Sequence, residues 1–214
     1  MNLKLQTLNF RLPSVLCLLV AACQSVLAAP SVFESYNCSI EFPPNWRVLD
    51  PTPPHTVAVA QTPDGSRTLM LIAEKLPAAE RANGLRDMIA GAKQSAIDKG
   101  WQISDERDTS VSGLPFHAFT TRVTGIASMV TFIGTSGDVG YVLQGICKAS
   151  DAASDAELKA AMNSFHLLSA LNVPAETDRP NSVAYRIGYI FGQALIMVVI
   201  GTVVVRLIRK ARNK

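Results

Sequence analysis

Residues 116–149, FHAFTTRVTGIASMVTFIGTSGDVGYVLQGICKA, contain three runs rich in apolar, β-branched and aromatic residues. The runs cover residues 116–124, 127–135 and 141–149, and short turns that contain glycine separate them. Runs of this length between glycine turns are typical of strands joined as hairpins. Because strands joined by short turns run antiparallel, this stretch predicts three antiparallel strands of one sheet.

Four further strands are predicted on the N-terminal side of this stretch. They cover residues 36–42, 56–61, 67–75 and 101–111. In the first of them Cys38, Ile40 and Phe42 alternate with polar residues, which is the pattern of a strand with one buried face.

Two amphipathic helices are predicted between and after the strands. The first one ends at Gly100, and the second opens with a capping box formed by Ser154 and Glu157. The apolar stripes consist of Leu85, Met88, Ile89, Ala92, Ala96 and Ile97 in the first helix and of Leu158, Ala161, Met162 and Phe165 in the second. Each stripe must be buried against another element. The sequence therefore predicts an α+β domain, with a central antiparallel sheet of about six to seven strands and two helices packed on it.

The N-terminal end of the chain is typical of a secretory signal peptide. Lys4 and Arg11 precede an apolar run that is too short to cross a bilayer, and small residues lead up to Ala28. We expect residues 1–28 to be removed. The stretch that ends in Cys23 also resembles a bacterial lipobox, so lipidation of Cys23 is an alternative to ordinary cleavage, as is an uncleaved N-terminal anchor.

The C-terminal end predicts one transmembrane helix, residues 183–208. No charged residue lies between Arg186 and Arg206, and a helix of this length spans roughly 30 Å, the thickness of a hydrocarbon core. Residues 169–182 form a linker, and residues 209–214 form a basic tail, which is expected to stay in the cytoplasm. We therefore expect a single-pass protein of the cell inner membrane, with a periplasmic domain at residues 32–168.

The predicted transmembrane helix contains a GxxxG pair, Gly188 and Gly192. Such a pair lets two helices approach closely, so these residues are a candidate helix–helix contact. Glycine is also common in membrane helices, and an incidental pair is the alternative. The lipid bilayer is the one partner that this end of the chain specifies.

The charge of the chain argues against nucleic-acid binding. All 17 acidic residues lie between Glu34 and Asp178, where they outnumber lysine and arginine, while the chain as a whole carries a net charge of +3. The excess of basic residues is thus located at the two ends, and the domain between them is acidic. Contacts to phosphate groups need a basic face, which this domain does not have.

The domain resembles the PsbP-like fold over residues 32–168. The resemblance rests on Ile40-Glu41-Phe42-Pro43-Pro44-Asn45-Trp46, on the helix after the third strand, on the turn Val111-Ser112-Gly113-Leu114-Pro115 and on the closing Ser164-Phe165. This superfamily includes an extrinsic subunit of photosystem II, a Ran-binding nuclear import factor and many bacterial exported proteins. The resemblance implies a domain that docks to partners rather than one that catalyses a reaction.

The domain contains two cysteines, Cys38 and Cys147, each on a predicted strand. In an oxidising compartment, two cysteines in one domain favour a disulfide, and two buried thiols are the alternative. No CxxC pair is present, which argues against a thioredoxin-like redox function.

Candidate catalytic and metal-binding residues are scattered along the chain. His55, His117 and His166 are far apart and have no partner at a ligand spacing, so the sequence predicts no metal site and no cofactor. The acidic residues Asp105, Glu106 and Asp108 lack the pattern of a calcium loop and are expected on a solvated face.

Three hypotheses about function follow from these features. The favoured one is a membrane-anchored extracytoplasmic binding or accessory module that docks an envelope protein. The second is an envelope enzyme whose site is assembled from scattered residues, such as His117 with Asp105 or Glu106. The third is a membrane protein that self-associates through Gly188 and Gly192.

Overall fold

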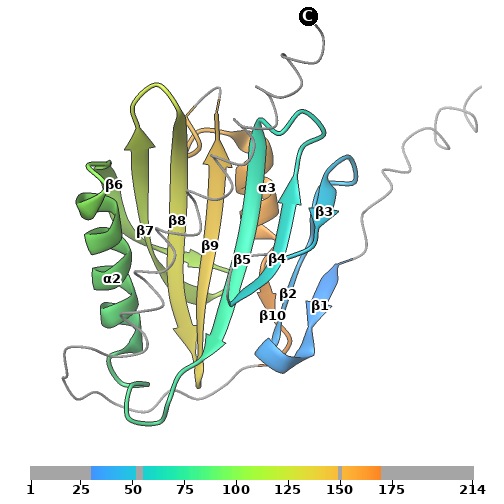
Figure 1. Cartoon of the computed structure of the whole chain (residues 1–214). Coiled ribbons are helices and arrows are strands. Elements are labelled where there is room, and N and C mark those ends of the chain that lie inside the picture. The colour runs from blue at the N-terminus through green and yellow to red at the C-terminus, as the bar shows by residue number, and fades with distance from the viewer. Residues whose placement is uncertain (1–29, 52–54, 149–150, 170–214) are drawn as a thin grey trace, which may run out of the picture.

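The computed structural model describes residues 30–51, 55–148 and 151–169, which form two antiparallel sheets and two α-helices (Figure 1). In chain order the elements are β1 (Ser31–Phe33), the 3-10 helix η1 (Glu34–Tyr36), β2 (Cys38–Ile40), β3 (Arg47–Leu49), β4 (Thr56–Gln61), β5 (Arg67–Lys75), α2 (Gly84–Asp98), β6 (Gln102–Val111), β7 (Leu114–Val123), β8 (Ala127–Ser136), β9 (Val139–Cys147), α3 (Ala156–Asn163) and β10 (His166–Leu167).

The large sheet has seven strands in the order β3-β4-β5-β9-β8-β7-β6, and every neighbouring pair is antiparallel. The predicted α+β class, the antiparallel sheet and the two helices are confirmed. Strands β7, β8 and β9 form the two hairpins predicted from residues 116–149, and β9 then pairs with β5 along its whole length.

The two helices cover opposite faces of the large sheet (Figure 1). On β5, Leu69 and Leu71 are buried in the same cluster as Leu158 of α3. Met70, which alternates with them, belongs to the cluster that contains Met88 of α2. Successive side chains of a strand point to opposite faces, so the continuous apolar run of β5 reflects burial on both sides.

The predicted strand at residues 36–42 does not join the large sheet, which corrects the prediction of one sheet. Only Cys38–Ile40 is extended, as β2, and it pairs with β1 on one side and β10 on the other. β1 and β10 are three and two residues long, too short to leave a periodic pattern in the sequence. This small sheet closes over the α3 face, where Phe165 packs edge-on to Phe116 and Tyr141 with ring centroids 5.8 and 5.3 Å apart.

The predicted start of the second helix is corrected by one residue. The N-cap of α3 is Asp155, whose side chain accepts a hydrogen bond from the Leu158 N–H at 3.0 Å. Ser154 instead donates to the carbonyl of Asp151, and Glu157 accepts from the indole N–H of Trp46 at 2.8 Å. Asp and Ser are similar N-cap residues, so the sequence alone does not separate these two choices.

The predicted membrane segments lie outside the described residues. This applies to the signal peptide at residues 1–28, with Cys23, and to the helix at residues 183–208, with Gly188 and Gly192. Within the part of the chain that the structure describes, no helix has the length and the apolar character needed to cross a membrane.

Candidate functional site

Two exposed apolar side chains and one half-buried indole come from the end of α2, the residue after Gly100 and the turn between β7 and β8. They are Ile97, Ile126 and Trp101, and they are together called the Trp101 end below. Ile97 is 60% exposed and Ile126 is 47% exposed. The indole of Trp101 packs on the buried cluster that contains Met129 and Ile146. Large apolar side chains that gather on a surface are a mark of an interaction site.

The local backbone explains how Trp101 reaches this position. Gly100 has φ +68° and ends α2, as the sequence predicted, because a left-handed conformation suits glycine. The N–H of Trp101 then donates to the carbonyl of Ala96 at 3.0 Å, which turns the chain towards β6. Ile97 follows the buried Ala96 by one residue, about 100° further round the helix, so it faces solvent. Its predicted place on the buried stripe is therefore wrong.

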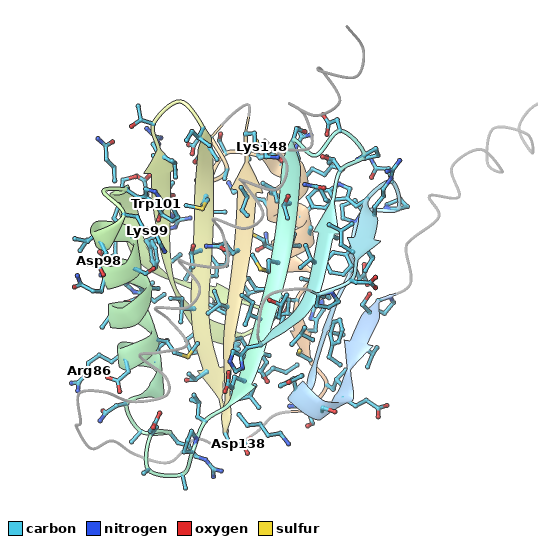
Figure 2. All side chains as sticks on the ribbon, viewed as in Figure 1. Arg86, Asp98, Lys99, Trp101, Asp138 and Lys148 are labelled. Carbon is cyan, nitrogen blue, oxygen red and sulfur yellow. The ribbon has the colours of Figure 1, made fainter. Side chains whose placement is uncertain are left out.

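Lys99 covers the exposed face of Trp101 (Figure 2). Its Nζ lies 5.1 Å from the centre of the indole ring and donates to Ser95 Oγ at 2.7 Å. Burial lowers the pKa of Lys99, since a desolvated ammonium group loses hydration. The cation–π contact holds the indole in one orientation and leaves a basic group at the edge of the Trp101 end.

The structure brings together His117 and Glu106, which the enzyme hypothesis named, and adds Asp108, which it did not name. His117 Nδ1 lies 2.9 Å from Asp108 Oδ1, and His117 Nε2 lies 3.0 Å from Glu106 Oε1. Lys93 of α2 forms a further ion pair with Glu106. Asp105, which the same hypothesis named, lies at a bulge of β6 with φ +54°, while both ring nitrogens of His117 face the other two carboxylates.

This cluster links α2 to the edge of the sheet. Hydrogen bonding and charge from Lys93 lower the pKa of Glu106, with a smaller contribution from His117. Both imidazole nitrogens face carboxylates on opposite sides of the ring, so one metal ion cannot take His117, Glu106 and Asp108 together. Among the described residues, no group of three or more His, Cys, Asp or Glu residues is arranged to hold a metal ion.

The remaining histidines lie apart from this cluster. His55 pairs with Glu74, whose pKa is raised because burial disfavours its charged form. His166 lies in β10 opposite Ser39.

Cys38 and Cys147 are both buried, and the described residues contain no disulfide between them. The Tyr141 hydroxyl donates to the carbonyl of Tyr36 at 2.7 Å, two residues before Cys38, so Cys38 lies towards the Tyr141 end of β9. Cys147 lies six residues further along that strand, about 20 Å away. A disulfide requires Cα atoms within roughly 7 Å. The predicted bridge is therefore not formed, and the alternative of two buried thiols describes the structure.

The two outer strands of the large sheet are protected against pairing with another chain. β3 is three residues long and is followed by Pro51, while β6 carries a bulge and several charges between Asp105 and Asp108. Short strands, prolines, bulges and charges all block strand addition. The Trp101 end is thus a better candidate for partner contact than either sheet edge.

Comparison with solved structures places this arrangement in a known class: the chain has the PsbP-like fold, as the resemblance in its sequence predicted. The solution structure of cyanobacterial PsbP (CyanoP) from Synechocystis sp. PCC 6803 matches with a TM-score of 0.51 and 12% identity, covering 68% of this chain and 96% of CyanoP. At this identity the likeness establishes the fold alone.

Two further solved structures are similar at lower scores. A protein from Bacteroides thetaiotaomicron has a TM-score of 0.46 and 10% identity, covering 66% of this chain, which spans about half (48%) of that protein. LpqN of Mycobacterium tuberculosis, described as involved in cell envelope biogenesis, has a TM-score of 0.40 and 19% identity. The match covers 64% of this chain and 80% of LpqN. No family model and no curated protein sequence matches the chain.

Proposed function

We propose that this chain is a membrane-anchored extracytoplasmic binding module that docks an envelope protein through its Trp101 end. The signal sequence and the apolar C-terminal segment support the anchored topology, and the PsbP-like fold supports a docking domain. The proposal rests on two exposed side chains and on Trp101 itself: Ile97 in the last turn of α2, Ile126 in the turn between β7 and β8, and the indole that packs on the cluster of Ala127, Met129 and Ile146.

The position of this surface suits a tethered domain. The described domain closes at Ser169, which hydrogen bonds to Asn37, and the neighbouring Tyr36 carbonyl accepts from Tyr141 Oη at 2.7 Å. Trp101 packs against the cluster that contains Ile146, which is five residues from Tyr141 and about 17 Å further along β9. Ser169, the last described residue before the predicted linker, therefore lies at the end of the sheet opposite the Trp101 end.

Site-specific photocrosslinking in intact cells tests the proposal. The full chain carries a photoreactive amino acid at Ile126 or, as a control of equal accessibility, at Val48 on β3, which is 62% exposed. Crosslinked products are purified from solubilised membranes and identified by mass spectrometry. We expect one abundant envelope protein from Ile126 and not from Val48, and its loss when Ile97→Asp is added. The same products from both positions, or none from Ile126, would contradict the docking proposal.

The same experiment separates the two alternatives. Crosslinks to a second copy of the chain alone, abolished by Gly192→Leu, would support self-association through Gly188 and Gly192. The enzyme hypothesis is favoured by the pairing of His117 with Glu106. It requires a bound small molecule beside these side chains, which native mass spectrometry of the purified chain would detect.

A further inference from the structure

A small cavity lies directly behind Trp101, between α2 and the large sheet. Its volume is about 20 Å³. Ala96, Trp101 and Met129 form part of the apolar wall, and Thr121, Thr131 and Gln144 supply the polar groups. A cavity needs roughly 10–15 Å³ to hold one water molecule, so this one has room for a single water.

Gln144 has a buried side-chain amide, and only the nitrogen of this amide has a hydrogen-bond partner among the described residues. It comes from β9, a central strand, and is 6% exposed. Its Nε2 donates a hydrogen bond to Thr131 Oγ1 on β8 at 3.4 Å, while its Oε1 has no hydrogen-bond partner among the described residues. A buried amide oxygen without a donor lowers stability, so its presence on a central strand calls for a donor inside the cavity.

The protein groups around the cavity do not provide that donor to Gln144 directly. The lining side chains other than Thr121, Thr131 and Gln144 have no strong hydrogen-bonding group in the cavity apart from the indole of Trp101. The Thr131 hydroxyl accepts from Gln144 Nε2, which leaves its own proton free to donate elsewhere. Two threonine hydroxyls and one amide oxygen amount to three partners, within the two to four that a buried water needs.

We propose that this cavity is a binding site for one long-lived water molecule, which donates a hydrogen bond to Gln144 Oε1 and bonds to the hydroxyls of Thr131 and Thr121. The water completes the hydrogen bonding of the sheet at the point where Trp101 and α2 close over it. This site lies beneath the Trp101 end but does not depend on its docking role, since the water binds whether or not a partner is present.

The full chain in detergent micelles allows a direct test by NMR. Magnetisation transfer from water to the Ala96 methyl group and to the Gln144 side-chain amide reports a water that stays for longer than nanoseconds. We expect both signals in the wild type and in Thr120→Val, and the loss of both in Thr131→Val. In Gln144→Leu, which has no side-chain amide at this position, the Ala96 signal reports alone and should be lost. Thr120 is the matched control because its buried hydroxyl also has no partner among the described residues but it does not line the cavity.

Two results would overturn the proposal. One is a wild-type protein in which neither group receives magnetisation from water, which means that the cavity is dry. The other is an Ala96 signal that survives in Thr131→Val and Gln144→Leu while the spectra show both variants folded, which means that the water is held by other groups.

Discussion

Arg67 Nε lies 2.7 Å from Asp155 Oδ2, so a charged hydrogen bond joins the start of β5 to the N-terminus of α3. The same carboxylate caps α3 through the Leu158 N–H. Asp155 is only 8% exposed, whereas the Arg67 side chain is 35% exposed. One acidic residue therefore both starts the helix and fixes it to the sheet.

Asp155→Ala is expected to lower the free energy of unfolding by about 2–3 kcal/mol, because the helix loses its cap and Arg67 keeps only its longer ion pair with Glu157, at 3.7 Å. Asp155→Asn is the matched control, since asparagine keeps the cap and removes only the charge. Urea titration followed by circular dichroism measures both. Equal stabilities for the wild type and Asp155→Ala would show that the contact with Arg67 contributes nothing.

The stability of the domain should fall at acidic pH through Asp155. Burial raises the pKa of this carboxyl, but the hydrogen bonds from Leu158 and Arg67 together outweigh burial and lower it. A lowered folded-state pKa gives stability that is present above the unfolded value, about 3.9, and is lost as pH falls through the folded value. Thermal unfolding between pH 6 and pH 2 should show this loss in the wild type and a smaller one in Asp155→Asn. If the melting temperatures of the two proteins fell equally with pH, Asp155 would not be the group responsible for the loss.

Gly134→Ala is expected to destabilise the domain by about 1–3 kcal/mol. Gly134 on β8 lies opposite Phe116, and an added Cβ would come within 2.8 Å of that ring and 3.0 Å of the Pro115 carbonyl oxygen. The ring is fixed by Phe132 and Phe165, so it cannot move aside freely. A shift of the urea midpoint measures the cost, and an unchanged midpoint would mean that the packing relaxes.

Glu106→Gln should change stability by less than about 1 kcal/mol, although it breaks contacts with Lys93 and His117. Glu106 is 46% exposed, and solvent screens much of its interaction. The effect should shrink further at high salt. Unfolding titrations at low and high salt measure it, and a loss of several kcal/mol would reveal a strongly coupled cluster.

Cys38 should remain reduced and unreactive in the folded protein. Burial raises the pKa of its thiol to about 12, so almost no thiolate exists at neutral pH. Iodoacetamide treatment of the native chain, followed by peptide mapping under non-reducing conditions, should leave Cys38 unlabelled until urea is added. A peptide that joins Cys38 to Cys147 would restore the disulfide prediction.

The hairpins were predictable because their information is local. β4 and β5 begin and end where the sequence predicted, at Thr56–Gln61 and Arg67–Lys75, since strand periodicity and the turn between them lie in one short stretch. The end of the first helix at Gly100 was predictable for the same reason, because a single glycine specifies it. By contrast, β1 and β10 form only because residues 31–33 and 166–167 meet β2, which no nearby residue specifies.

The candidate sites were less predictable than the strands. His117 and Glu106 were named together from the sequence as one possible pair, and the bulge of β6 brings them within 3.0 Å. The Trp101 end and the Gln144 cavity had no sequence signal. Their residues come from α2, the loop after it and strands β7, β8 and β9, and each residue alone resembles an ordinary core position.

The sequence by itself determined the α+β class, the antiparallel hairpins and the resemblance to the PsbP-like fold. These features depend on neighbouring residues: the alternation of apolar and polar side chains, the turn residues and the residues that end helices. Only the tertiary structure decided that β2 leaves the large sheet, that Cys38 and Cys147 stay apart, and that Ile97 faces solvent beside Trp101. These outcomes depend on which distant elements pack together, and the free energy of that packing comes from contacts between residues far apart in the chain.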